Sequence, residues 1–247
     1  MKKYYLIAFL FGVLAVPAVQ AQTIVLNQDT SNYSYGDGGE FNAVPDANLL
    51  SFNPTLAGYS PYTANLVAGS PNFQTFCIET EVYFSPGDTY NVIPSYGILP
   101  DSQFPTGNPI TLGTAWLYSQ FAAGTLSGYD YTEGSGRIAT AGDLQQAIWY
   151  LEGDVSSLVN GSADGTAFYT AAATDLGADL SDPADGAYGV ICLNLRDDYV
   201  QDQLMVVPDP SAVVVSVPEP SVVSFGLFLL PLLGVYKMRV LFGKQTG

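Results

Sequence analysis

The sequence predicts an α+β fold, in which a mainly antiparallel β domain carries a helical insertion. One observation is a change of period along the chain. Residues 73–84 alternate between apolar and polar side chains, whereas residues 111–122 and 140–151 repeat apolar side chains at helical spacing. The other is the order of segments, because strand-like residues resume at 188–195 and 203–207 after the helices.

The clearest predicted strand covers residues 73–84. Phe76 and Ile78 share one face with Thr80, Val82 and Phe84, and Cys77 shares the other with Glu79, Glu81 and Tyr83. The turn residues Pro86-Gly87-Asp88 follow, so residues 89–93 are predicted to return as the hairpin partner. Residues 23–26 predict a further short strand, and the glycines within 32–41 predict a turn.

Three helices are predicted in the middle of the chain. The first covers residues 111–122. The second is expected to begin at Thr140-Ala141-Gly142-Asp143, which is similar to a capping box, and to reach about residue 151. The alanine-rich residues 163–176 predict the third.

The N-terminus has the three parts of a secretion signal. Lys2 and Lys3 precede an uncharged apolar run, and small residues then lead to Ala21. This order predicts a signal peptide over residues 1–21, cut by signal peptidase between Ala21 and Gln22. One folded, exported domain is predicted over residues 22–207.

The C-terminus carries a second signal. A proline-rich linker over residues 208–221 ends in the sequence Val217-Pro218-Glu219-Pro220-Ser221. A weakly apolar helix and a sparse basic tail are predicted over residues 222–247, with the basic end on the cytoplasmic side. This order resembles the PEP-CTERM sorting signal of Gram-negative bacteria. The resemblance implies a transient stay in the inner membrane, cutting by exosortase near Pro218–Ser221, and delivery to the cell surface or extracellular matrix.

The charge of the domain excludes several classes of function. All 23 acidic residues of the chain except Glu219 lie within residues 22–217, together with two basic residues, Arg137 and Arg196. Nucleic acid is therefore excluded as a partner, because binding it requires lysine and arginine. The chain also has no histidine, which removes the commonest general base and the histidine-dependent nucleophile pairs.

Two short motifs indicate a specific covalent chemistry. Phe76-Cys77-Ile78 lies on the predicted strand, and Leu144-Gln145-Gln146-Ala147-Ile148-Trp149 lies on the second helix. Together they resemble the thioester domains of bacterial surface adhesins, although Leu144 replaces the threonine of that pattern. The resemblance implies a bond between the Cys77 sulfur and the Gln145 side-chain carbonyl. Trp149, one helical turn beyond Gln145, is then placed to shield the bond from water.

The two cysteines leave alternatives open. An even count in an exported chain is also typical of a disulfide, here between Cys77 and Cys192. Cys192 lies on a predicted strand that can neighbour the strand of Cys77. A thioester, a disulfide and two separate thiols all remain compatible with the sequence, and the first two exclude each other.

Carboxylates supply two further hypotheses. Glu79 and Glu81 lie side by side on one strand face, a pair that suits glycoside hydrolysis if it is not a solvated surface. Asp179, Asp182 and Asp185 recur at three-residue spacing and are weak calcium candidates, without the spacing of an EF-hand. No other cofactor is predicted.

These observations predict an exported surface or matrix protein without turnover chemistry, which adheres to a surface glycan or protein ligand. Covalent adhesion through Cys77 and Gln145 is one alternative. A secreted carbohydrate-active enzyme that uses carboxylates is the other.

Overall fold

The structure is a computed structural model. It describes residues 22–28, 33–36, 38–52, 72–80, 82–100, 104–195 and 200–213. The chain divides into two compact units, Met1–Val214 and Val215–Gly247, and every described residue belongs to the first.

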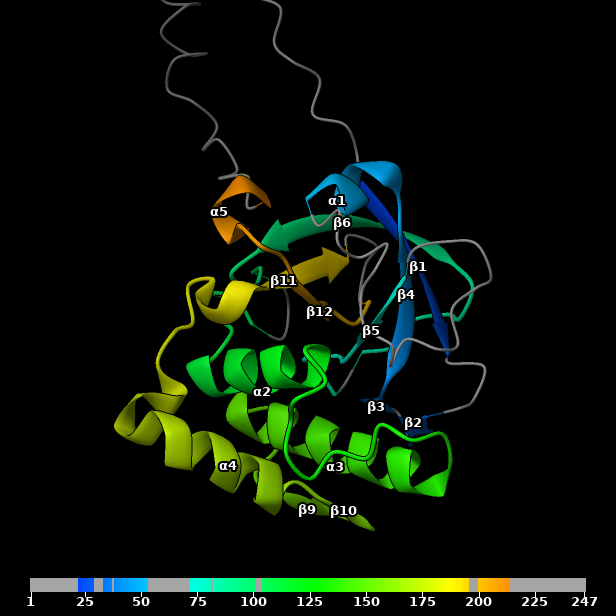
Figure 1. The fold of residues 1–247 in the computed structure, drawn as a ribbon. Helices are drawn as coiled ribbons and strands as arrows, with labels where there is room; N and C mark the ends of the chain where they lie inside the picture. Colours follow the sequence, from blue (N-terminus) through cyan, green and yellow to red (C-terminus); the bar gives the residue numbers. More distant parts are fainter. Residues whose placement is uncertain are drawn as a thin grey trace, which may run out of the picture. The chain divides into compact units, whose positions relative to one another are not determined.

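The main sheet of the described chain has six strands, all paired antiparallel, in the order β12-β11-β6-β1-β4-β5 (Figure 1). Its strands are β1 (Gln22–Gln28), β4 (Phe41–Pro45), β5 (Phe73–Thr75), β6 (Thr89–Ser95), β11 (Val190–Leu195) and β12 (Gln203–Val206). The two central strands, β1 and β6, come from the first half of the domain. The sheet therefore brings distant parts of the chain together.

The two edges of this sheet meet. Directly after β5, Cys77 forms an isolated antiparallel bridge with Gln203 of β12. Leu204 donates its backbone N–H to the Phe76 carbonyl, and Ile78 donates to the Asp202 carbonyl, both at 3.2 Å. The sheet therefore closes like a small barrel, which satisfies backbone groups that a free edge would leave unpaired.

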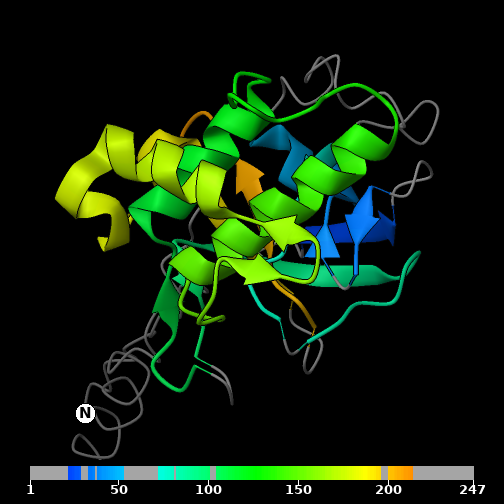
Figure 2. The same cartoon turned by 90° about the horizontal axis from the view of Figure 1, so that it is seen from below.

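Helices α2 (Leu112–Ala122), α3 (Ser135–Leu151) and α4 (Thr166–Leu176) lie beneath the strands in Figure 1. Seen from below, they lie in front of the strands (Figure 2). Apolar residues of the helices pack with Phe76 and Ile78, which follow β5, and with outward-facing strand residues such as Cys192. This helix-sheet layer is one hydrophobic core.

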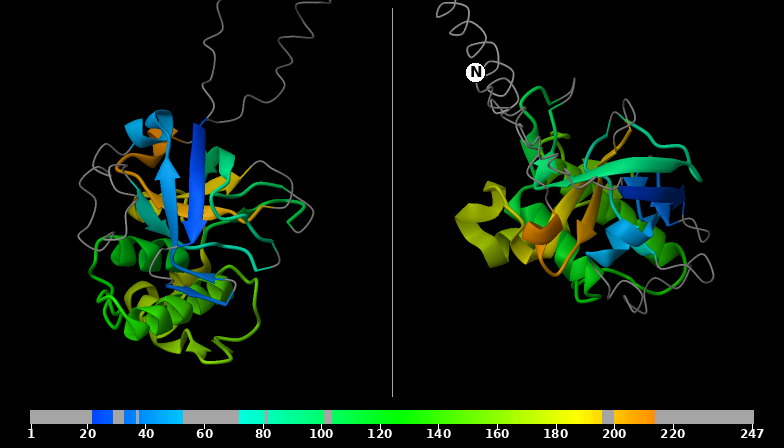
Figure 3. Two further views of the ribbon diagram at one scale, coloured as in Figure 1. Left: turned by 90° about the vertical axis from the view of Figure 1, so that its right-hand side faces the viewer. Right: turned by 90° about the horizontal axis from the view of Figure 1, so that it is seen from above.

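A second core lies on the opposite face of the strands. Alternate residues of β11 separate the two cores, because Ile191 and Leu193 belong to the second and Cys192 to the first. The short helix α1 (Ala47–Ser51) adds Leu49 to the second core. Figure 3 shows β1, β4 and α1 on the side away from the helices.

Short elements connect these layers. The described chain also contains β2 (Ser34–Tyr35), β3 (Gly38–Gly39), β7 (Gly97–Ile98), β8 (Asn108–Pro109), β9 (Val159–Asn160), β10 (Ala163–Asp164), the 3₁₀ helices η2 (Gly177–Ser181) and η3 (Ala187–Gly189), and α5 (Pro210–Val213). The β2–β3 hairpin and the β9–β10 hairpin both contact α3. They position the site described below.

The fold class is α+β and mainly antiparallel, as predicted. The first predicted helix is confirmed, since Thr111 caps α2 by accepting a hydrogen bond from the Thr114 backbone N–H at 3.2 Å. The strand predictions at 23–26, 188–195 and 203–207 correspond to β1, β11 and β12.

The predicted long strand over 73–84 is wrong, and so is its hairpin. Regular pairing stops at Thr75, and the described residues beyond Cys77 are irregular. β5 pairs with β4, while β6 pairs with β1 and β11. The alternation at 76–78 is nevertheless real, because Phe76 and Ile78 face one core and Cys77 faces a different cluster.

The second helix begins earlier than its sequence predicted. α3 starts at Ser135, and Thr140-Ala141-Gly142-Asp143 lies inside it. The Thr140 hydroxyl donates back to the Gly136 carbonyl at 3.1 Å, so it does not act as a cap. Gly142 leaves room for Tyr35, whose Cγ would lie 2.5 Å from an added Cβ.

Several predictions fall outside the described residues. These are the signal peptide over 1–21, the sorting motif Val217–Ser221 and the apolar tail over 222–247. Among the helices that the structure does describe, none has the length and apolar character to cross a membrane.

A buried carboxylate joins the end of α3 to the start of α2. Glu152 accepts the backbone N–H and the hydroxyl of Thr111, each at 3.1 Å, and is only 6% exposed. Burial raises the pKa of Glu152 to about 7, although hydrogen bonds from Thr114 and Thr111 act to lower it. Glu152 is therefore largely neutral below neutral pH.

We expect Glu152 to make the domain less stable as pH rises. Its pKa is higher in the folded than in the unfolded state, so its contribution is complete below the unfolded value and is lost as pH rises to about 7. In Glu152→Gln this loss is absent. The difference in unfolding free energy between wild type and variant should change by roughly 3 kcal/mol between about pH 4 and about pH 8. Denaturant titrations across this pH range measure it, and a difference that stays constant with pH would contradict the raised pKa of Glu152.

Candidate functional site

The structure brings Cys77 and Gln145 together. Cys77 lies just after β5, and Gln145 lies on the third turn of α3. The Cys77 thiol donates to Gln145 Oε1 with a distance of 3.2 Å between sulfur and oxygen. In return, Gln145 Nε2 donates to the Cys77 backbone carbonyl at 2.7 Å. Two reciprocal contacts therefore hold the thiol and the carboxamide side by side.

Both groups are withdrawn from solvent. Cys77 has no exposed surface and Gln145 is 1% exposed. The neighbouring Gln146 points elsewhere, because its Nε2 donates to the Ser157 carbonyl at 2.6 Å. Of the two adjacent glutamines, Gln145 is therefore the one that meets the cysteine.

The β2–β3 hairpin covers the carboxamide. The Gly39 backbone N–H donates to Gln145 Oε1 at 3.2 Å. An added Cβ at Gly38 would lie 2.5 Å from Gln145 Cγ and 2.6 Å from the Trp149 ring. Glycine at 38 is therefore required by close approach of the hairpin to α3. Sequence reasoning assigned this glycine pair to a flexible turn and missed its contact with Gln145.

Trp149 packs beside the pair, as its spacing predicted. It forms a small apolar cluster with Phe41 and Cys77, and it is 9% exposed. The ring therefore excludes water from one side of the Cys77 sulfur.

A pocket of about 340 Å³ opens beside Gln145. Tyr35 and Asn160 come to its wall from the two hairpins, and Thr80, Trp149 and Asp154 also line it. The Tyr35 hydroxyl and the Ser162 hydroxyl are 2.5 Å apart, which ties the hairpins together. Asp154 is the one charged side chain among the described residues that line this pocket, and it accepts the Thr80 backbone N–H.

The thiol is held in its neutral form. Burial raises the pKa of Cys77 well above its ordinary value, and the charges of Glu79 and Asp154 raise it further, while the Trp149 side chain acts in the opposite direction. A thiolate enzyme needs the reverse, because its cysteine is activated by a lowered pKa.

The disulfide between Cys77 and Cys192 is not formed. Both cysteines are buried free thiols. β12 lies between them, since Cys77 bridges to Gln203 and Cys192 pairs with Leu204 from the other side of that strand. Two strand spacings amount to about 10 Å, beyond the reach of a disulfide of about 7 Å between Cα atoms. The strand of Cys192 is thus not the neighbour of the Cys77 segment.

Of the predicted carboxylate pair, the structure describes Glu79 alone. Glu79 is 2% exposed, so it does not belong to a solvated face, and its Oε2 accepts the Asp202 backbone N–H at 2.8 Å. Its carbonyl accepts Gln201 Nε2 at the same distance. Glu81 lies outside the described residues. Glu79 thus secures the 76–80 segment to the chain before β12.

The acidic run after α4 lies on the surface. Asp179, Asp182 and Asp185 are exposed, and the Asp182 carbonyl accepts the Leu112 backbone N–H at 2.8 Å at the start of α2. Within the described part of the chain, no three acidic or cysteine side chains gather as a metal site. Calcium binding stays a prediction.

A buried ion pair stands next to the site, and sequence reasoning missed it. Glu40 and Arg137 have 0% and 1% of their side chains exposed. Arg137 Nε donates to Oε1 of Glu40 at 2.8 Å, and Nη2 donates to Oε2 at 2.7 Å. Burial acts to lower the pKa of Arg137, but the hydrogen bonds and charge of Glu40 outweigh it and raise that pKa.

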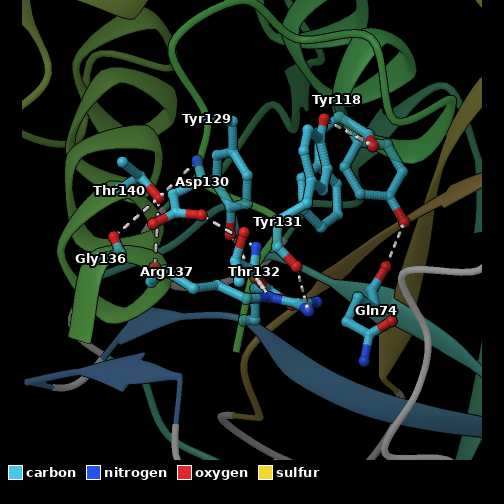
Figure 4. A network of polar contacts seen from close by, with 11 residues as sticks. Gln74, Tyr118, Tyr129, Asp130, Tyr131, Thr132, Gly136, Arg137 and Thr140 are labelled. Carbon is cyan, nitrogen blue, oxygen red and sulfur yellow. Dashed lines mark hydrogen bonds and ion pairs between the residues drawn. The ribbon is translucent and has the colours of Figure 1, made fainter. Parts of the chain in front are cut away.

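Tyr129 and Tyr131 lie beside Arg137 (Figure 4). The Tyr129 hydroxyl donates to Glu40, and the Tyr131 carbonyl accepts Arg137 Nη1 at 3.3 Å. The Arg137 guanidinium also lies 4.3 Å from the centre of the Tyr33 ring. Position 137 holds one of only two arginines in an acidic domain, which is the sequence signal that could have indicated a buried partner.

Comparisons with known proteins add no relative to this picture. No protein-family model, curated protein or solved structure matches the chain. The site is therefore interpreted from its own geometry.

We expect Gly38→Ala to disrupt the packing of the hairpin against α3. The added methyl group would overlap Gln145 and Trp149, which should lower the free energy of unfolding by about 2–3 kcal/mol. The matched control is Gly36→Ala in the same hairpin. Its Cβ would meet nothing within 4 Å, and it should lose only about 1 kcal/mol because of its positive φ of 58°. Equal losses in denaturant titrations would contradict this account.

Proposed function

We propose that this protein is a covalent surface adhesin whose Cys77 and Gln145 form an internal thioester. The observation that carries the proposal is the buried contact of 3.2 Å between the Cys77 sulfur and Gln145 Oε1. The reciprocal hydrogen bond from Nε2 to the Cys77 carbonyl supports it, because both ends of the future bond are already oriented.

The chemistry needs no cofactor. The Cys77 sulfur attacks Gln145 Cδ, the C–N bond breaks, and the carboxamide nitrogen leaves as ammonia with the thiol proton. The product is a thioester, whose carbonyl is more electrophilic than an amide. An amine on a target surface then attacks Cδ, forms an amide bond with Gln145, and releases Cys77 as a free thiol. Each event joins one target molecule to the domain and does not turn over.

The environment of the pair supports a stored bond over an enzyme site. The thiol is neutral, because burial raises its pKa, and the chain has no histidine to activate it. Residues 22–217 also contain no lysine, so a thioester in this domain is not consumed by the domain's own lysines. Burial behind Trp149 protects the bond from hydrolysis.

Charge favours a cationic amine as the target group over a neutral hydroxyl. Asp154 lines the pocket beside Gln145, and the domain around it is strongly acidic. The field of these carboxylates concentrates cations at the pocket. Lysine side chains of a partner protein have that chemistry.

The terminal segments give this adhesin its proposed location. Residues 1–21 export the chain, and Val217–Ser221 with the following apolar segment act as a PEP-CTERM signal for exosortase. The mature domain would then remain at the cell surface or in the extracellular matrix. A glycosidase receives no support from the site, because Glu79 is buried and occupied with backbone groups.

We expect the native exported domain to weigh less than its sequence by the mass of one ammonia. Methylamine should add its own mass to the thioester form, which leaves Gln145 one CH2 heavier than its sequence mass and frees Cys77 for alkylation. Intact-mass and peptide mass spectrometry measure both changes. Cys77→Ala should abolish the deficit, because the bond loses its sulfur.

Cys192→Ala is the matched control, since it removes the other buried thiol without touching Gln145. It should retain the deficit and the reaction with methylamine. A native domain at its full sequence mass would rule out the thioester. A loss of two hydrogens, restored by reductant, would contradict both the thioester and the separation of Cys77 from Cys192 by β12.

We expect the thioester to prefer amines with a second positive charge. A diamine such as 1,5-diaminopentane should react about fivefold faster than taurine, whose far end is anionic, after correction for the free-base concentration of each. Asp154→Asn keeps an oxygen for the Thr80 N–H but removes the charge, so it should reduce this ratio. Rates from mass spectrometry at low and high salt test it, because added salt should also reduce the ratio. A ratio near one in wild type would exclude charge selection.

A further inference from the structure

The carbonyl oxygen of Gln145 already has a backbone donor. The Gly39 N–H lies 3.2 Å from Oε1, within the buried space between the β2–β3 hairpin and α3. Oε1 is the oxygen that remains on Gln145 throughout the proposed chemistry, since the nitrogen leaves as ammonia. A donor fixed on this oxygen therefore acts on the carboxamide, the thioester and the intermediates between them.

We propose that the Gly39 N–H is the oxyanion donor of this site, and that the buried Glu40–Arg137 pair positions it. The inference rests on the proposed thioester and assigns roles to three residues outside the Cys77–Gln145 pair. Gly39 contacts the reacting carbonyl, whereas Glu40 and Arg137 act through the backbone.

The role of the Gly39 N–H follows from the position at which negative charge develops during the reaction. When an amine attacks Cδ of the thioester, the π electrons of the carbonyl move to Oε1, which becomes an oxyanion. Collapse of this intermediate restores the carbonyl and expels the Cys77 sulfur, which takes up the proton lost by the amine. A fixed N–H in a buried site stabilises the oxyanion more than the neutral carbonyl, which lowers the barrier. Attack by Cys77 on the carboxamide places charge on the same oxygen.

The Glu40–Arg137 pair is placed to hold this donor. Glu40 directly follows Gly39, and its carboxylate accepts hydrogen bonds from Nε and Nη2 of Arg137. Arg137 belongs to α3, the helix that carries Gln145 two turns further on. The pair therefore fixes the chain at residue 40 to the same rigid element as the reacting carbonyl. Two-point ion pairs of this kind also set orientation.

The backbone at Gly39 cannot be tested by ordinary substitution. Its φ is +93°, and an added Cβ would lie 2.8 Å from the Tyr33 carbonyl oxygen and the Tyr35 nitrogen. Any side chain would deform the hairpin. Replacing Gly39 by glycolic acid is the direct alternative, because it exchanges the N–H for an ester oxygen and leaves the shape unchanged.

The experiment uses full-length exported protein with glycolic acid at position 39. Methylamine attack on the thioester should slow by about tenfold to a hundredfold, because one oxyanion donor is lost. The infrared band of the thioester carbonyl should move to higher frequency, since its hydrogen bond is gone. A purely structural role of the N–H would leave this band unmoved. A variant that folds but forms no thioester also supports the proposal, because formation passes through the same oxyanion.

Arg137→Lys tests the positioning pair. Lysine keeps the buried positive charge but cannot make the two parallel hydrogen bonds that Arg137 donates to Glu40. We expect the carbonyl band to shift in the same direction and aminolysis to slow by about tenfold. Glu152→Gln is the control, since it changes another buried carboxylate on the far end of α3 and should alter neither band nor rate.

The outcomes separate this inference from the function on which it rests. A wild-type domain without the ammonia deficit would contradict both the proposed thioester and the donor role of Gly39. A wild-type thioester whose carbonyl band and methylamine rate are unchanged by glycolic acid at 39 would end the donor role alone. A folded Arg137→Lys variant with wild-type rate and band would remove the positioning role and leave the donor in place.

Discussion

A carboxamide that is removed from water needs hydrogen-bond partners within the protein. Much of this structure serves to supply those partners to Gln145. Burying an amide without hydrogen bonds costs several kcal/mol in an apolar medium. Gln145 receives the Gly39 N–H and the Cys77 thiol on its oxygen and gives its amide hydrogen to the Cys77 carbonyl. Gly39 and Cys77 precede Gln145 by 106 and 68 positions, so satisfying this one side chain requires the hairpin, the barrel and α3 to meet.

Closure of the sheet sets the position of Cys77. Residues 76–78 leave β4 and pair with β12, so Cys77 lies where the barrel closes rather than in the middle of a long strand. Glu79 secures this crossing through the backbone of Asp202. The same geometry places β12 between Cys77 and Cys192. The arrangement that brings the thiol to Gln145 therefore also separates the two cysteines.

Local patterns in the sequence predicted the fold class, the span of α2 and the end of α3, whereas the contact of Cys77 with Gln145 was implied only by the resemblance to thioester domains. They failed where long-range packing outweighs a local signal. The capping-like residues at Thr140 lie inside α3, because Gly142 serves the contact with Tyr35 and the helix gains a further turn before it. The pairing of β5 with β4 and the burial of Glu40 with Arg137 depend on residues far apart in the chain. A short stretch of sequence carries no signal that predicts contacts between residues so far apart.

The groups around the proposed bond come from residues 38–39, 77, 145 and 149, so the reactive centre exists only in the finished tertiary structure. An extended chain carries an ordinary glutamine and an ordinary cysteine, separated by 68 positions. If both the proposed chemistry and the proposed export hold, the unfolded polypeptide is inert while it is secreted. The electrophile then arises only when the domain folds outside the inner membrane.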